Sequence, residues 1–139
     1  MRIWIARLCI GIITVWNLQV AFIFIFSPSR FVGAYELSGT VGEAAVRGVG
    51  VLFLMWNVPY LFALVHPICY RLELTLSLLM QFIGLIGESY ILSTVPVEHV
   101  ILRSSILRFI AFDGAGLIFL VTAWLLTRGD QPKPDMYQV

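Results

Sequence analysis

Residues 43–65 read EAAVRGVGVLFLMWNVPYLFALV. This run is apolar and long enough to cross a bilayer as a helix, which takes about 20 residues. It nevertheless carries Arg47 near one end, and Asn57 and Pro59 deeper in. A guanidinium inside a membrane helix costs at least about 2.5 kcal/mol on insertion scales, so it usually faces protein or water. We therefore expect the rest of the chain to form a bundle in which such polar groups meet.

The composition indicates a membrane protein. Of 139 residues, 60% are hydrophobic and only 12% are charged, whereas soluble domains are about half apolar and about a quarter charged. A net charge of +1 gives no electrostatic reason to expect nucleic acid as a partner. Cys9 and Cys69 form no CxxC motif, and we expect thiols at both positions rather than a disulfide.

Four apolar segments predict one all-α domain over residues 1–127, an antiparallel bundle of four transmembrane helices. The predicted helices are Ile3–Phe26, Ala44–Val65, Leu72–Ser93 and Ile101–Leu126. Residues 128–139 are polar and proline-rich, which predicts an exposed tail without helix.

The connections and the basic residues predict how the bundle is arranged. The loops at 66–71 and 94–100 are short, which makes successive helices antiparallel neighbours. The longest connection, 27–42, contains RFVGAYEL, which we predict to be a short interfacial helix with Phe31 and Tyr35 at the level of the lipid headgroups. A modest bias of Lys and Arg favours an inner-membrane protein with both termini in the cytoplasm and the 27–42 loop outside.

Three charges are predicted to lie at one depth near the outer surface, namely Arg47, Glu88 and Arg108. Glu88 is the expected partner of Arg47. One interpretation is a polar pocket, open to the outside, that binds an anionic or polar group. The other is a structural ion pair that holds the second and third helices in register.

Asp113 is predicted to lie deeper, where an ionised carboxylate is most costly. It could carry a proton or anchor a ligand, or it could be held by a hydrogen bond to Asn57, Gln81 or Asn17. These alternatives stay open, as does the ionisation state of Asp113.

One face of the third helix carries Ser77, Gln81, Gly84 and Glu88 at helical spacing. Small residues let helices approach closely and polar ones hydrogen-bond across, so this face predicts helix packing or, alternatively, a lined cavity. The candidate ligand-binding residues are Arg47, Glu88, Arg108, Asp113, Asn57 and Gln81.

Motifs of common enzymes are missing from the sequence. It contains no HExxH, P-loop, GxSxG or clustered Cys/His signature, so it predicts no catalytic residue and no metal ligand. Enzymatic activity is unsupported, and the alternative of an uncommon enzyme that uses Glu88, Asp113 and Arg108 stays open.

The run RGVGVLFL at residues 47–54, with GLIGE at 84–88, resembles DoxX-like four-helix membrane proteins, in which an Arg-Gly-x-Gly start of the second helix follows a long first loop. The resemblance implies a compact four-helix bundle associated with redox or quinone-linked membrane complexes, or an accessory factor. The resemblance implies a functional role for no residue of this chain other than Arg47. The lack of paired cysteines argues against thiol-based redox activity.

These observations predict a non-enzymatic accessory or structural subunit that packs against other membrane proteins or against a second copy within the bilayer. The alternative is a binder or carrier of a small amphipathic ligand, a quinone or a lipid, held in an outward-facing polar cavity. No other cofactor is expected.

Overall fold

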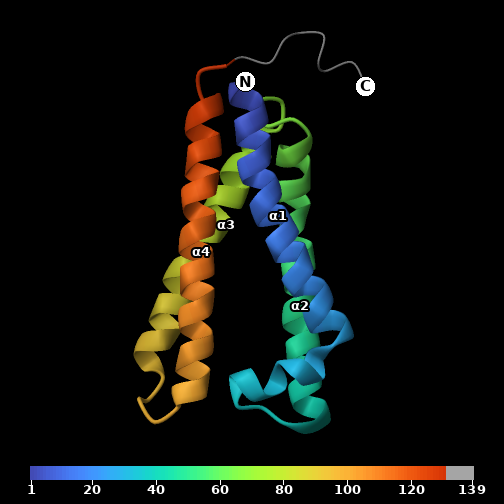
Figure 1. Ribbon diagram of the computed structural model, residues 1–139, viewed down its shortest axis with the longest axis vertical. Coiled ribbons are helices and arrows are strands. Elements are labelled where there is room, and N and C mark those ends of the chain that lie inside the picture. Colours follow the sequence, from blue (N-terminus) through green and yellow to red (C-terminus); the bar gives the residue numbers. More distant parts are fainter. Residues whose placement is uncertain (131–139) are drawn as a thin grey trace.

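The computed structural model, which describes residues 1–130, contains four long antiparallel helices (Figure 1). They are α1 (Arg2–Phe26), α2 (Gly39–Val65), α3 (Arg71–Thr94) and α4 (Val100–Thr127). Each is long and apolar enough to cross a membrane. The predicted all-α bundle with four membrane-spanning helices is therefore confirmed, and the chain is a small integral membrane protein.

The helix boundaries agree with the predicted ones except at the start of α2. This helix begins at Gly39, more than a turn before Ala44, and Gly39 has a positive φ of 63° that a side chain would strain. At its other end α2 continues through Pro59 to Val65. The part of the predicted tail at residues 131–139 lies outside the described residues.

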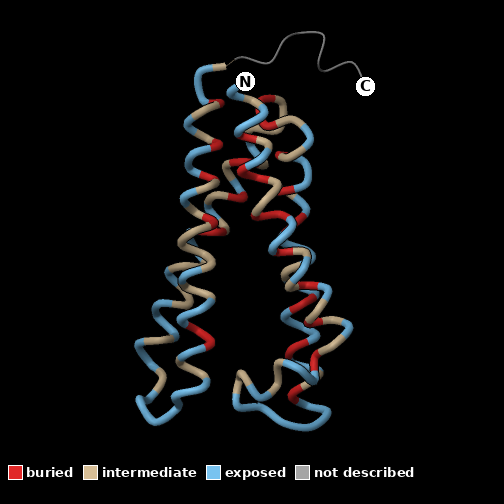
Figure 2. Tube along the Cα trace, in the orientation of Figure 1, coloured by how far each residue is buried: buried red, intermediate tan, exposed pale blue. Residues whose placement is uncertain are grey.

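The helices form two hairpins, α1–α2 and α3–α4, which meet at the end that carries the N-terminus and diverge toward the 27–38 loop (Figure 1). Contacts between the hairpins are made by α1 with α4 and by α2 with α3. Buried residues gather where all four helices meet, while the far halves of α3 and α4 are mostly exposed or half-buried (Figure 2).

The core at the closed end is built from small and branched side chains. Small residues let the helix backbones approach closely, which is what drives packing in a bilayer that offers no hydrophobic force between helices. Cys9 is a thiol in this core. The buried cluster comprises Ala6, Cys9, Ile10, Ile13, Tyr60, Ala63, Leu74, Leu120 and Ala123.

Three arginines hydrogen-bond the C-terminal carbonyls of neighbouring helices. The last carbonyls of a helix lack intrahelical partners and carry partial negative charge, so a guanidinium is a favourable cap. Arg7 donates to Leu64 O at 3.0 Å, and Arg103 donates to Leu92 O at 3.1 Å. The complete set of pairs is Arg7 with Leu64, Arg71 with Thr127, and Arg103 with Leu92 and Val95. These charges therefore stabilise helix ends near the membrane boundaries without a carboxylate.

The long connection folds as two short 3₁₀ turns, η1 (Pro28–Arg30) and η2 (Val32–Tyr35). Short helical structure was predicted here. The rings of Phe31 and Tyr35 pack on Phe24 of α1, with centroid distances of 4.8 and 6.2 Å. The loop thus folds back against the helices, and its anchoring among lipid headgroups stays a prediction.

Candidate ligand-binding site

A chain of hydrogen bonds joins three helices at the centre of the bundle. The Tyr60 hydroxyl on α2 donates to Gln81 Oε1 on α3 at 2.7 Å, with Ser77 O as a second acceptor at 3.1 Å. Gln81 Nε2 in turn donates to Asp113 Oδ1 on α4 at 2.9 Å. Of the three hydrogen-bond partners predicted for Asp113, namely Asn57, Gln81 and Asn17, Gln81 is the one that it contacts.

Two glycines make this chain of hydrogen bonds possible. A Cβ at Gly84 would lie 2.7 Å from Asp113 Oδ2, and a Cβ at Gly116 would lie 2.7 Å from Gln81 Nε2. Each polar side chain therefore occupies the space that a glycine leaves on the facing helix. The predicted packing role of the α3 face is confirmed for Ser77, Gln81 and Gly84.

Asn57 and Asn17 lie near this chain without completing a ligand site. Asn57 is fully buried, its Nδ2 donates to Phe53 O at 2.7 Å, and its Oδ1 has no hydrogen-bond partner among residues 1–130. Asn17, Gln81 and Asp113 line a cavity of only ≈ 10 Å³, which is about the space of one water molecule. Of the predicted site residues, Gln81 and Asp113 thus line a volume too small for an organic ligand, and Asn57 does not line it.

The predicted ion pair between Arg47 and Glu88 is wrong. Arg47 pairs with Glu43 at 3.1 Å, one turn away on the same helix. Because α2 begins at Gly39, Glu43 is helical and falls at the i, i+4 spacing that brings opposite charges together. Glu88 is half-buried and makes no ion pair within residues 1–130.

The third member of the predicted charge group, Arg108, is also without a carboxylate partner in the described chain. Its guanidinium donates to Ser105 Oγ at 3.2 Å and to Ser104 O at 3.4 Å, both on its own helix. The structure therefore does not bring Arg47, Glu88 and Arg108 together as a network. It places Arg108 on the wall of a separate, larger cavity.

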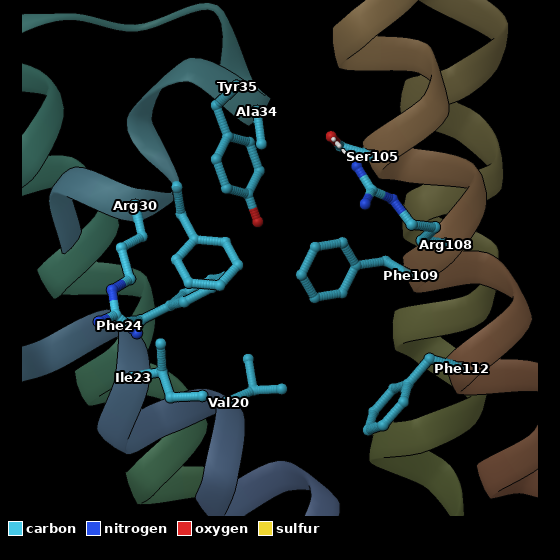
Figure 3. A pocket seen from close by; sticks show the side chains of 11 residues that line it. Val20, Ile23, Phe24, Arg30, Ala34, Tyr35, Ser105, Arg108, Phe109 and Phe112 are labelled. Atoms are coloured by element: carbon cyan, nitrogen blue, oxygen red, sulfur yellow. Dashed lines mark hydrogen bonds between the residues drawn. The ribbon is translucent and has the colours of Figure 1, made fainter. Parts of the chain in front are cut away.

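This larger cavity lies between the hairpins, where the 27–38 loop closes their diverging ends (Figure 3). Its volume is ≈ 340 Å³, within the roughly 300–1,000 Å³ of typical small-molecule sites. Arg30 lies on the η1 side and Arg108 on the α4 side, and the Tyr35 hydroxyl points into the space between (Figure 3). The lining residues are Val20, Ile23, Phe24, Arg30, Phe31, Ala34, Tyr35, Ser105, Arg108, Phe109 and Phe112.

Aromatic rings form most of the apolar wall. Phe24, only 1% exposed, lies 6.3 Å from Phe109 between ring centroids and also contacts Tyr35 and Phe53. Deeper in, Phe112 packs on Trp16 at 5.5 Å. Of the residues that line the cavity, only Arg108, Phe31 and Tyr35 are singled out by the sequence patterns. The spacing of Phe109 and Phe112 places both on one face of a helix. This spacing indicates a cavity wall only once α1 and the loop are known to face α4.

Glu36 fastens the loop to the start of α4. Its side chain contacts His99 Nδ1 and accepts a hydrogen bond from Leu102 N at 3.3 Å. Glu36 also adopts the left-handed conformation, with φ 55°, which is uncommon for a residue other than glycine. The contact joins the segment that carries Tyr35 to the helix that carries Arg108, and so fixes two walls of the cavity relative to each other.

The Glu36–His99 contact should weaken both when the pH rises and when it falls. The hydrogen bond with Glu36 raises the pKa of His99 above 6.5, so the contact is lost as pH rises through that raised pKa. The hydrogen bond from His99 lowers the pKa of Glu36 below 4.5, so the contact is also lost as pH falls through that lowered pKa. We expect it to be strongest from about pH 4.5 to 6.5, between the two ordinary values.

A histidine NMR titration in nanodiscs checks this expectation. Glu36→Gln should lower the pKa of His99, whereas the signal of His66, at the far end of α2, should be unaffected. An unchanged His99 titration in Glu36→Gln would show that the contact does not form in solution.

Comparisons with known proteins identify no family. No family model matches the chain, and neither a curated protein nor a solved structure matches it significantly. The class of protein is therefore defined by the structure alone, as a four-helix integral membrane protein, and the resemblance to DoxX-like proteins stays a prediction.

Proposed function

We propose that this protein binds a small amphipathic molecule, of the quinone or lipid class, in the cavity between its two hairpins. The observation that carries this proposal is the ≈ 340 Å³ cavity with its aromatic wall and its polar groups at one end. Ligand sites are typically apolar with a few placed polar groups that fix orientation. The protein would then act as a binder or carrier.

The cavity changes from polar to apolar along the helix axis, as an amphipathic ligand requires. On α4, Ser105 and Arg108 lie toward the loop, and Phe112 lies about 10 Å deeper than Ser105 at 1.5 Å per residue. On α1, Val20 lies on the deep side as well. A polar head would sit near the loop while the apolar part extends toward the middle of the bilayer.

Filling the deep end of the cavity tests the proposal. Val20→Trp should reduce the amount of ligand that remains bound to the gently solubilised protein by about tenfold or more, because the indole occupies the space of the apolar part. Native mass spectrometry measures the bound fraction. Val15→Trp is the matched control, since Val15 is on the same helix and 61% exposed. Equal loss, or equal retention, in the two variants would contradict the proposal.

A second candidate function is that of an accessory subunit within a larger membrane assembly, which the sequence patterns favour. Gly48 on α2 and Gly87 on α3 have no atom within 4 Å of a would-be Cβ, so both present open, small positions where a partner helix could approach. The same mass spectra would detect such a partner as a complex that survives mild detergent and dissociates in harsh detergent.

For the membrane and its orientation we propose the inner membrane, with both termini in the cytoplasm. The basic residues near the terminal end include Arg2, Arg71 and Arg128, which supports a cytoplasmic location under the positive-inside rule. Under this orientation the cavity and the Glu36–His99 contact lie on the outer side.

A further inference from the structure

We infer that the ligand of this cavity is an anionic amphiphile with a single apolar chain, whose carboxylate or phosphate head is held by Arg108 and the Tyr35 hydroxyl. This inference rests on the proposed function and specifies its ligand class. The evidence is the hydrogen-bonding character of the cavity's polar end, together with its charge and its size.

The polar groups at the head end offer donors and almost no acceptors. Arg30 and Arg108 can only donate, and neither has a carboxylate partner within residues 1–130. The hydroxyl of Ser105 already donates to Ile101 O at 3.2 Å and accepts from Arg108. A head group that accepts several hydrogen bonds is therefore the complementary one.

Tyr35 adds a further donor. Its hydroxyl faces the cavity (Figure 3) and has no hydrogen-bond partner in the described chain. Burial raises the pKa of Tyr35, the charge of Glu88 raises it further, and the charge of Arg108 opposes them, so the hydroxyl stays protonated. A protonated phenol can donate to an anionic oxygen.

The charges around the head end sum to a positive value when His99 is protonated. Arg30 and Arg108 line the cavity, Glu88 lies close enough for its charge to act on Tyr35, and Glu36 is engaged with His99. Two positive and two negative charges therefore balance while His99 is neutral, and one net positive charge remains when His99 is protonated. Guanidinium groups bind carboxylates and phosphates with strong, often bidentate hydrogen bonds.

The size of the cavity favours one chain. A volume of ≈ 340 Å³ is at the small end of the usual range for ligand sites. Its length of about 10 Å between Ser105 and Phe112 suits the first part of a single extended chain with the head at the loop. A bilayer lipid with two chains would have to leave one of them outside.

Three single-chain probes test the inference with the full-length protein in detergent. Oleate and oleyl alcohol share one chain and differ in charge, and oleoyl lysophosphatidate carries a phosphate instead. Titrations followed by native mass spectrometry should give oleate at least about tenfold higher affinity than the alcohol, because hydrogen bonds to charged groups contribute about that much. The tighter of the two anions identifies the head group.

Charge variants then assign the effect to the site. Arg108→Gln should weaken oleate binding about tenfold and leave the alcohol unchanged, whereas Glu88→Gln should strengthen oleate binding. Arg47→Gln is the matched control, since Arg47 pairs with Glu43 and does not line the cavity. It should change neither probe.

The possible failures are distinguishable. Equal affinity for oleate and oleyl alcohol, with both displaced by Val20→Trp, would overturn the anionic ligand while the proposed function stands. Arg47→Gln weakening oleate as much as Arg108→Gln would overturn it as well, by showing a non-specific charge effect. If no probe binds and Val20→Trp changes nothing, the proposed function itself is wrong.

Discussion

Gly50→Ala should destabilise the protein by about 1–3 kcal/mol, the usual cost of forcing an extra methyl group into a packed interface. A Cβ at Gly50 would lie 2.9 Å from Phe24 Cβ, 2.9 Å from Ile25 Cγ1 and 3.0 Å from Ala21 O. Phe24 Cβ and Ala21 O are fixed by the α1 backbone, so a rotamer change cannot relieve the contact and α1 must move away from α2. Unfolding in mixed micelles, followed by circular dichroism, measures the loss.

Gly48→Ala is the matched control, because it makes the same substitution two residues earlier on α2. Nothing lies within 4 Å of a Cβ at Gly48. Alanine is also the better helix former by up to about 1 kcal/mol, so this variant should be neutral or slightly more stable. Equal effects at the two positions would show that α1 and α2 do not pack through Gly50.

The same displacement should reach the cavity, since Phe24 follows α1 and its ring contacts Phe31, Tyr35 and Phe109. Gly50→Ala should therefore lower ligand retention together with stability. Val20→Trp should lower retention without a comparable change in stability, because it fills existing space instead of separating two helices.

Much of the architecture follows from one physical constraint, which the sequence displays directly. Long apolar runs separated by short polar loops have few alternatives in lipid, because backbone groups must be satisfied within each crossing segment. The helix boundaries predicted from hydropathy were accurate for α1, α3 and α4. The start of α2 was missed because four of residues 39–43, all except Val41, are small or polar, yet they form a helical turn at the membrane edge.

The pairing of charges could not be deduced from depth alone. Arg47, Glu88 and Arg108 were predicted to meet because they lie at similar heights, but at this end the hairpins diverge (Figure 1). Arg47 finds Glu43 within its own helix, and Arg108 finds two serines. Partners on the same helix are favoured because the contact does not require separate helices to approach. A sequence does not reveal the angle between two hairpins.

The hydrogen bond of Asp113 was easier to anticipate than the cavity. Gln81 and Asp113 are rare polar residues in mid-helix, so few partners are available to either. The cavity, in contrast, is made of phenylalanines from α1, the loop and α4, which are indistinguishable in sequence from lipid-facing ones. Their role depends on the 27–38 loop folding back between the hairpins, which is a tertiary feature.

Gln81→Met should cost about 1–3 kcal/mol of stability, mainly because it leaves the Asp113 carboxyl group without its hydrogen-bond donor. Methionine keeps the length of the side chain and removes the hydrogen bonds of Gln81 with Tyr60 and with Asp113. Tyr60 retains Ser77 O as an acceptor at 3.1 Å, so its hydroxyl is not left alone. Asp113 loses the donor that lies 2.9 Å from its Oδ1. The penalty therefore falls on a carboxyl group in the middle of the bundle.

A double-mutant cycle isolates that penalty. Asp113→Leu alone leaves Gln81 Nε2 with the backbone oxygen of residue 113 as an acceptor, at 3.4 Å. Asp113→Leu together with Gln81→Met replaces both polar partners by apolar groups, and the pair should cost clearly less than the sum of the single changes. A coupling of at least about 0.6 kcal/mol, the average for hydrogen bonds between membrane helices, is expected in micelle unfolding.

Thr122→Val is the control for this cycle, because Thr122 is exposed on α4 and, within the described residues, its side chain donates only to Ile118 O of its own helix. It should be neutral within about 0.5 kcal/mol. Strict additivity of Gln81→Met and Asp113→Leu would mean that α3 and α4 are not joined by this hydrogen bond. The glycines at 84 and 116 would then have no polar side chain to accommodate, and the closeness of the two helices would need a different cause.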